Sequence, residues 1–318
     1  MQFTVWDTGI FHLPNNLHIC YIFPEILFGC KPPAKIDILR LLGYYLPMNP
    51  LSKNIFIQKI RFSFFLILIL FLSGSGKTTA TENTLPFKPG EIMTFHVKWA
   101  FIPAGDAVLE VLPVETFNGE KSYHFLFTAR TNEYVDLIYK VRDRVDSYTD
   151  IGMTHSLMYR KQHQAGSTKD VVVNFNWELN QAQYSNFGEK LEPVTILPGA
   201  FDPLSVFFAF RIYDLNNNVE VETPVTDGKK CIIGKAKKIK EERIKVAGGT
   251  FDTFLIEPEM EHIGGVFKKS KGAKLQIWVT SDKRRIPVKI KSKVIVGSFV
   301  AELVSYEISP VQDNKVTE

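Results

Sequence analysis

MTFHVKW, residues 93–99, is the stretch that decides the fold, because every second side chain in it is apolar. A period of two places alternate side chains on opposite faces of a β-strand, so one face is buried and the other is solvated. Later stretches repeat this alternation at residues 123–129, 171–177, 275–279 and 286–293. Aromatic and β-branched residues fill them, as half-buried strands favour. The sequence therefore predicts a protein built mainly from β-strands.

Short turn signals separate these stretches. Asn118-Gly119 and Asp227-Gly228 are typical of tight hairpins, because a type I′ turn needs positive φ at both central residues. Strands joined by such turns, with almost no intervening helix, indicate an antiparallel meander. We expect an all-β fold, in which a single antiparallel meander of about 11–13 strands forms a curved sheet, a half-barrel or a barrel.

Residues 202–211 interrupt the strand pattern. Asp202 is a favourable helix N-cap and Pro203 suits a first helical turn. The apolar residues that follow form a nearly continuous run as far as Arg211. We expect one short helix here that plugs or covers the sheet, and one more buried strand is the alternative. Because no repeat or long linker is evident, we expect a single domain over residues 81–318, frayed after residue 308.

The composition is that of an ordinary folded protein. The chain has 318 residues, of which 45% are hydrophobic and 23% charged, with a formal net charge of +4. This excludes a disordered, collagenous or polytopic membrane chain. Residues 1–80 contain seven Lys or Arg and three Asp or Glu, so this segment accounts for the whole net charge. The remainder is neutral and lacks aromatic stacking positions beside its basic residues, so we expect no nucleic-acid partner.

The N-terminal part contains a secretory signal pattern at residues 48–80. Three basic side chains, Lys53, Lys59 and Arg61, precede an 11-residue apolar run at residues 62–72. A small polar stretch then leads to a cleavage position after Ala80. The run is shorter than the roughly 20 residues that span a bilayer. We therefore expect a periplasmic or otherwise exported protein with no transmembrane span in its mature form. An inner-membrane anchor at 62–72 is the alternative.

Residues 1–47 precede this signal and show no regular period. A signal normally opens a protein. We therefore expect translation to start at Met48 and residues 1–47 to be an over-extended start or disordered, with Met1 as the alternative start.

Cysteine and histidine usage predicts no metal site and no cofactor. Cys20 and Cys30 lie within residues 1–47, which leaves Cys231 alone in the exported part. A single thiol forms neither an internal disulfide nor a multi-cysteine metal site. The histidines share no ligand spacing.

Several short motifs follow one another in a fixed order. They are Phe87-Lys88-Pro89-Gly90-Glu91, Ala104-Gly105-Asp106-Ala107, the stretch VRDRVDS at 141–147, Asp202-Pro203-Leu204-Ser205, IWVTSD at 277–282 and Ile286-Pro287-Val288. Over residues 86–308 the chain resembles a bacterial exported family known as domain of unknown function 3108. The resemblance implies an all-β periplasmic protein, and it supplies no activity or catalytic residues. A more distant similarity to lipoprotein-carrier half-barrels is an analogy of fold only.

Asp143 is the most informative polar residue. In its predicted strand it shares a face with Val141 and Val145, and a buried carboxylate needs a cationic or multi-donor partner. Arg130 and Arg211 are the candidate partners. Asp143 is then either an internal anchor for a ligand head group or half of a structural ion pair beneath the helix.

Charge is unevenly distributed along the exported part. Residues 229–293 contain 18 Lys or Arg and 7 Asp or Glu. Many of these lysines alternate with Ile and Val and so line an outer sheet face. They either solvate the sheet and protect its edges, or they attract anionic lipid head groups or an acidic envelope polymer.

These features together predict a cell-envelope protein, more readily non-catalytic than an enzyme, that binds a lipophilic or anionic envelope component or a partner protein on its curved sheet. The predicted ligand-binding residues are Asp143, Arg211, Arg130, Trp99, Phe125, Phe127, Phe207 and Phe208. A hydrolase-like enzyme acting on envelope polymers, through clustered acids such as Glu257, Glu259 and Glu261, is one alternative, and a structural scaffold is another. An open apolar cavity would favour binding, and two close carboxylates in a polar cleft would favour catalysis.

Overall fold

The computed structural model describes residues 85–259, 274–294 and 297–310, all within one compact unit. The predicted signal at 48–80, the stretch 1–47 and Glu261 lie outside the described residues. Among the described residues, no helix is both long and apolar enough to cross a membrane.

Within these residues the chain forms sixteen strands and three short helical segments. The first eight strands are β1 (Glu91–Trp99), β2 (Ile102–Val111), β3 (Glu115–Phe117), β4 (Glu120–Thr131), β5 (Arg142–Asp150), β6 (Ser156–Ala165), β7 (Ser167–Asn176) and β8 (Gln181–Asn186). The others are β9 (Glu189–Lys190), β10 (Val194–Thr195), β11 (Glu220–Thr226), β12 (Cys231–Val246), β13 (Gly249–Pro258), β14 (Lys274–Thr280), β15 (Pro287–Val294) and β16 (Gly297–Ile308). The helical segments are α2 (Glu133–Asp136), α3 (Ser205–Ala209) and the 3₁₀ helix η2 (Phe210–Ile212).

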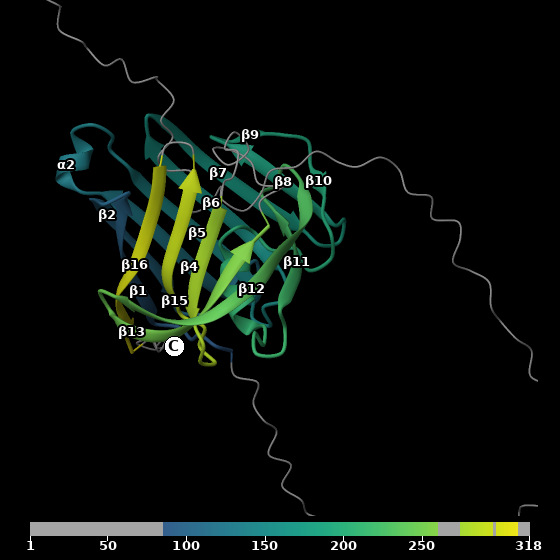
Figure 1. The fold of residues 1–318 in the computed structure, drawn as a ribbon. Coiled ribbons are helices and arrows are strands. Elements are labelled where there is room, and N and C mark those ends of the chain that lie inside the picture. The colour runs from purple at the N-terminus through teal and green to yellow at the C-terminus, as the bar shows by residue number, and fades with distance from the viewer. Residues whose placement is uncertain (1–84, 260–273, 295–296, 311–318) are drawn as a thin grey trace, which may run out of the picture. The chain divides into compact units, whose positions relative to one another are not determined.

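All sixteen strands belong to one antiparallel sheet, so the predicted all-β meander is confirmed (Figure 1). Its order is β10-β8-β7-β6-β5-β4-β2-β1-β16-β15-β14-β13-β12-β11, with β3 beside β4 and β9 beside β8. The pairing of β1 with β16 joins the start and the end of the described chain in the middle of the sheet. The strand count exceeds the predicted 11–13, because β3, β9 and β10 are only two or three residues long and show no usable alternation.

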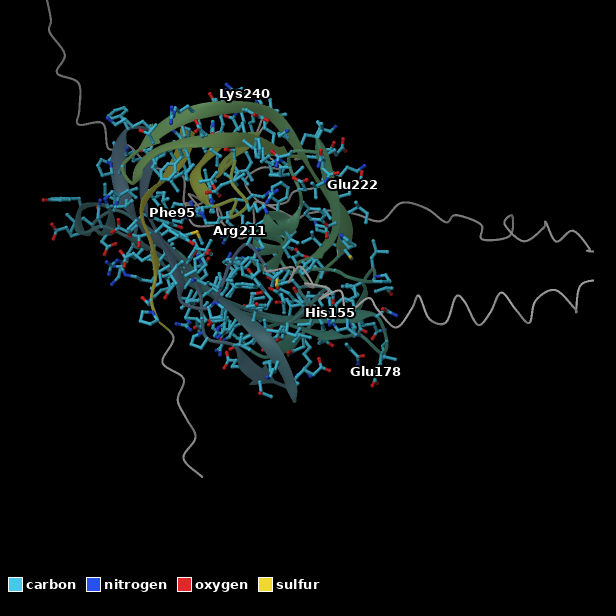
Figure 2. The ribbon with its side chains drawn as sticks, turned by 90° about the horizontal axis from the view of Figure 1, so that it is seen from below. Phe95, His155, Glu178, Arg211, Glu222 and Lys240 are labelled. Carbon is cyan, nitrogen blue, oxygen red and sulfur yellow. The ribbon has the colours of Figure 1, made fainter. Side chains whose placement is uncertain are left out.

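The described strands form an open sheet whose two ends meet without strand pairing. Its end strands are β10 and β11. A single parallel bridge joins Phe201, which follows β10, to Val225 of β11. Phe201 N–H donates to Pro224 O at 3.0 Å, and Thr226 N–H donates to Phe201 O at 2.9 Å. The sheet therefore curls around an interior in which Arg211 lies (Figure 2).

Helix α3 fills part of this interior, which confirms the predicted short helix and excludes a buried strand there. The ring of Phe208 is fully buried and stacks on Phe125 of β4 with 3.9 Å between ring centroids. The ring of Phe87 contacts both of them edge-on, at 5.4 and 5.5 Å. Helix α2 is a four-residue segment with no buried residue.

Asp202 attaches α3 to the inner face of the sheet. Its Oδ1 accepts hydrogen bonds from the N–H groups of Leu204 and Ser205 at 2.8 and 2.9 Å, as a capping residue does. Its Oδ2 accepts hydrogen bonds from the hydroxyls of Ser147, Ser156 and Ser205, each at 2.6 Å. A carboxylate buried with this many donors is satisfied by the fold itself.

Candidate functional site

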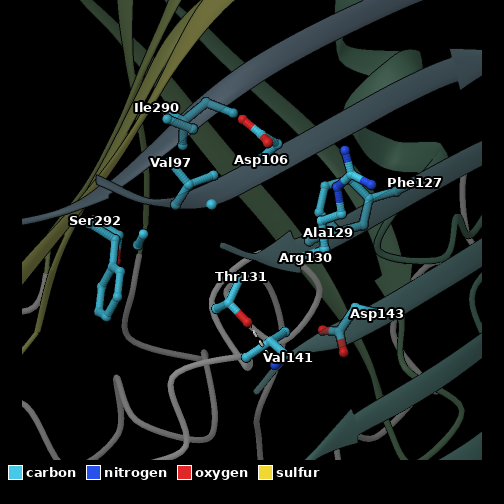
Figure 3. Close-up of a pocket in the computed structure, with 14 residues that line it drawn as sticks. Val97, Asp106, Phe127, Ala129, Arg130, Thr131, Val141, Asp143, Ile290 and Ser292 are labelled. Carbon is cyan, nitrogen blue, oxygen red and sulfur yellow. Dashed lines mark hydrogen bonds between the residues drawn. The ribbon is translucent and has the colours of Figure 1, made fainter. Parts of the chain in front are cut away.

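Two cavities lie against the inner face of the sheet. The first, which we call the Asp143 cavity, has a volume of about 80 Å³ (Figure 3). Its apolar lining comes from five strands and their connections and includes Val97, Ala104, Phe127, Ala129, Ile290 and Phe299. Asp143 and Ser292 are its buried polar residues, and the Ser292 hydroxyl has no hydrogen-bond partner within the described part of the chain.

The partner of Asp143 is His163, so the prediction that Arg130 or Arg211 would pair with it is wrong. His163 Nδ1 donates to Asp143 Oδ1 at 2.6 Å, and both side chains are buried. The two residues lie directly opposite each other on β5 and β6. The sequence analysis missed His163, although the alternation of β6, which places it on the inner face, is a signal that could have identified it.

Arg130 borders the Asp143 cavity (Figure 3), but its side chain is exposed. The residue opposite Asp143 on β4 is Ala129, and the next side chain points to the other face. Arg130 also lines a polar trough of about 880 Å³ on the outer face of the sheet, together with Arg142 and Arg144. Arg142 is paired with Asp136 and Arg144 with Asp146, at 2.5 and 2.7 Å.

Arg211 is a structural residue whose partner is Glu91. Its two Nη atoms donate to the two Glu91 carboxylate oxygens, the second at 3.2 Å, and both side chains are fully buried. Its Nε donates to Arg284 O at 3.0 Å, and Nη2 also donates to Pro86 O at 3.1 Å. Tyr306 donates its hydroxyl to Glu91 at 3.1 Å. Glu91 of β1 is therefore bonded both to Arg211 of η2 and to Tyr306 of β16.

The predicted aromatic lining divides into core residues and cavity residues. Phe125 and Phe208 are fully buried in the main core and line neither cavity. Phe127 lines the Asp143 cavity and Phe207 lines the second cavity. Trp99 is half-buried and its ring stacks on Phe299 at 6.4 Å.

The second cavity, which we call the Arg285 pocket, has a volume of about 90 Å³. It lies between α3–η2 and strands β11 to β14, and its apolar lining includes Val206, Phe207, Phe210, Ile232, Ile256 and Ile277. Four of its charged lining residues are Arg211, Arg285, Lys235 and Glu259. All four have a partner of opposite charge, because Arg211 pairs with Glu91, Lys235 with Glu222, Glu259 with Lys237 and Arg285 with Asp214.

Arg285 was missed by the sequence reasoning, although it ends a run of three basic residues directly before an apolar strand. The residue is 6% exposed. Its Nη1 donates to Lys283 O at 3.0 Å and its Nη2 to Asp214 Oδ1 at 3.2 Å, while the buried Nε has no partner among the described residues. Burial lowers the pKa of the Arg285 guanidinium, and the charges of Asp214 and Asp282 oppose this shift.

The acids proposed for a hydrolase each have a neighbouring cation where the structure describes them. Glu257 pairs with Lys274 at 2.7 Å and Glu259 with Lys237 at 3.2 Å. Across the described ranges, no three His, Cys, Asp and Glu side chains gather in a way that could hold a metal ion. Cys231 is half-buried in β12, and burial raises the pKa of its thiol.

Comparison with known proteins places residues 94–304 within a family described as "Protein of unknown function (DUF3108)". One similar solved structure is a β-barrel-like protein of domain of unknown function DUF1849 from Brucella abortus. It has 8% sequence identity and a TM-score of 0.46, and the match covers 70% of this chain and 98% of that one. The hypothetical protein CT021 from Chlamydia trachomatis has 8% identity and a TM-score of 0.34, with 73% and 93% of the two chains covered. No curated protein matches the sequence.

Proposed function

The chain belongs to the family described as protein of unknown function DUF3108, and from this premise we propose that it is a non-catalytic protein of the bacterial cell envelope. In this proposal it binds a lipophilic or anionic envelope component, or an apolar group of a partner protein, inside its curved sheet. The secretory signal pattern at residues 48–80 supports the location.

The observation that carries the proposal is the pair of mainly apolar cavities on the inner face, of about 80 and 90 Å³. Concave apolar sites with a few placed polar groups are the usual form of a ligand pocket. Because a cavity of about 150 Å³ holds one benzene molecule, each of these cavities encloses room for about three or four heavy atoms. A cavity of this size accepts a short aliphatic segment of a ligand, and the rest of a larger molecule stays outside.

The pairing of the interior charges supports binding over hydrolysis. Asp143 is held by His163, Glu91 by Arg211, and Asp202 by three hydroxyls. A hydrolase needs carboxyl groups that are available to exchange protons with a substrate. These three are instead engaged by the fold.

The test is native mass spectrometry of the full chain, purified in several preparations from the envelope fraction of a bacterial host. We expect a bound small molecule on the wild-type protein. Ala236→Phe would place a ring in the Arg285 pocket, and Ala129→Phe would do the same in the Asp143 cavity. At least one of these variants should lose the bound molecule.

The control is Val219→Phe, which adds the same type of ring at a position that is 64% exposed. It should keep the bound molecule. Recovery of no small molecule in any wild-type preparation, or its full retention in both cavity variants, would contradict the proposal.

A further inference from the structure

We propose that the Arg285 pocket is a binding site for a short aliphatic carboxylate, whose carboxylate group contacts the Arg285 guanidinium and whose chain lies among the apolar side chains of α3 and β11 to β14. This inference rests on the proposed function, because it assigns a ligand class to one of the two cavities described there.

The first argument is the incomplete hydrogen bonding of Arg285. A guanidinium has five N–H donors, and the structure shows acceptors for one hydrogen each on Nη1 and Nη2. The buried Nε–H has no acceptor within the described part of the chain. A buried charged donor without a partner is unfavourable. Because Arg285 lines the pocket, an acceptor that enters it can take up donor hydrogens that remain on the guanidinium.

The second argument is charge. The two cations that line the pocket besides Arg285 already have carboxylate partners, Glu91 for Arg211 and Glu222 for Lys235. Asp214 reaches Arg285 through one contact at 3.2 Å, while its oxygens also accept hydrogen bonds from Asn216 and Asn217. Arg285 makes two donor contacts, whereas the buried Arg211 makes four. Of the two buried lining cations, Arg285 therefore has more donor capacity left for an anion. A carboxylate fits, because its two oxygens match the planar, forked geometry of a guanidinium.

The third argument is the backbone conformation of Arg285. Its backbone φ is +46°, in the left-handed region that side chains other than glycine and asparagine seldom adopt. The surrounding turn holds this conformation, since Thr280 Oγ1 accepts from Ile286 N–H at 2.9 Å and Asp282 O from Arg285 N–H at 3.2 Å. Strained residues that a structure holds in this way occur often at ligand sites.

The size of the pocket limits the ligand. Enclosed room for about three or four heavy atoms corresponds to a carboxylate group and the first one or two carbon atoms of its chain. Longer chains would leave methylene groups outside and would gain little further affinity from this pocket.

The experiment measures binding to the full chain by isothermal titration calorimetry at pH 7. The probes are hexanoate, 1-hexanol and hexylammonium, which share one alkyl chain and differ in charge. We expect hexanoate to bind at least about tenfold more tightly than 1-hexanol, as a charge-assisted hydrogen bond implies, and hexylammonium to bind most weakly. Dodecanoate should bind no more than about threefold more tightly than hexanoate.

Arg285→Gln should reduce the ratio of hexanoate to hexanol affinity to about one. Arg284→Gln is the matched control, because the neighbouring Arg284 is exposed and bonded to Asp282, and it should leave the ratio unchanged. If Arg285→Gln fails to fold, Ala236→Phe provides the second test, since it blocks the pocket and keeps the guanidinium. It should abolish hexanoate binding.

The measurements distinguish failure of the carboxylate inference from failure of the proposed function. Equal affinity for hexanoate and hexanol, or a ratio that Arg285→Gln does not change, would overturn the carboxylate inference while the apolar pocket of the proposed function remained. Absence of hexanoate binding would overturn it as well. The proposed function itself would fail only if the native protein also carried no small molecule.

Discussion

At the scale of single residues, buried polar groups explain why several motifs of this chain are arranged as they are. The motif Asp202-Pro203-Leu204-Ser205 combines a capping carboxylate with a hydroxyl that turns back to it. Ser147, at the end of the VRDRVDS motif, donates to the same carboxylate. Two motifs that are about 55 residues apart are thus parts of one hydrogen-bond network.

We expect Asp202→Ala to lower the free energy of unfolding by about 3 kcal/mol, because it leaves several buried donors without an acceptor. Urea denaturation followed by circular dichroism would measure this change. The control is Asp252→Ala, which removes a 67% exposed carboxylate on β13 and should change stability by less than about 0.5 kcal/mol. Equal effects of the two substitutions would show that the Asp202 network adds no stability.

Arg284 and Arg285 show the limit of prediction at this scale. The two residues are adjacent and chemically identical, yet Arg284 is exposed and bonded to Asp282, whereas Arg285 is buried beside a cavity. The positive φ of Arg285 reverses the direction of the chain at this point. No local pattern in the sequence predicts which of the two side chains turns inward.

At the scale of strands and turns, the two dipeptides Asn118-Gly119 and Asp227-Gly228 predict the same structure, a tight hairpin turn. Asn118 and Gly119 both adopt positive φ, of +50° and +87°, as a type I′ turn requires. In the second turn, which joins the paired residues Thr226 and Cys231, Gly228 adopts positive φ, of +81°, and Asp227 does not, so the prediction of a type I′ turn is wrong there. The surroundings of the two glycines also differ. A Cβ atom at Gly119 would meet nothing within 4 Å, whereas at Gly228 it would lie 2.7 Å from a methyl group of Val173 and 3.2 Å from Cβ of Tyr184.

We therefore expect Gly228→Ala to destabilise the protein by about 2–3 kcal/mol, through both the backbone conformation and overpacking against β7 and β8. Gly119→Ala, the matched control, carries only the conformational cost of about 1 kcal/mol. Thermal unfolding of the two variants would compare them. Equal melting temperatures would contradict the close contact of the β11–β12 turn with β7 and β8.

Glu302 connects three neighbouring strands and makes stability dependent on pH. It accepts hydrogen bonds from Lys98 of β1 at 2.8 Å and Lys289 of β15 at 2.9 Å. Burial raises the pKa of the Glu302 carboxyl, but the two lysine hydrogen bonds outweigh this effect and hold the pKa below its ordinary value.

Because the folded pKa lies below the unfolded value of about 4.3, the contribution of Glu302 to stability is present above that pH and is lost as the pH falls through the folded pKa. We expect the unfolding free energy of the wild type to decline below about pH 4. Glu302→Gln should be less stable at pH 7 by about 1 kcal/mol and should decline less steeply. Parallel pH profiles of the two proteins, from urea denaturation at pH 2 to 7, would contradict this role.

At the scale of the whole molecule, the sheet is organised by the pairing of β1 with β16. This pairing places the described chain ends side by side, and the Arg211–Glu91 ion pair and Tyr306 reinforce it from the inside. The strands on both sides of this seam follow one another in chain order, as a meander does. The interior that results contains α3 and the two cavities.

The signal pattern at residues 48–80 makes a prediction for the whole chain. We expect the protein isolated from the envelope fraction of a bacterial host to begin at Thr81, because signal peptidase would cleave after Ala80. N-terminal sequencing would establish this. A mature protein that retains residues 62–72 would instead support the inner-membrane anchor.

The sequence by itself determined the fold class, the antiparallel pairing of the strands, the Asn118-Gly119 hairpin turn and the short helix, because alternation, turn chemistry and capping are local properties of the chain. Only the tertiary structure decided that the sheet stays open, that Asp143 pairs with His163 and Arg211 with Glu91, and that Arg285 borders a pocket. Glu91 of β1 and Arg211 of η2 are 120 residues apart, and only the packing of η2 inside the sheet brings them together. Partners of this kind depend on how the whole sheet curls, and a pattern of neighbouring residues contains no measure of that curvature.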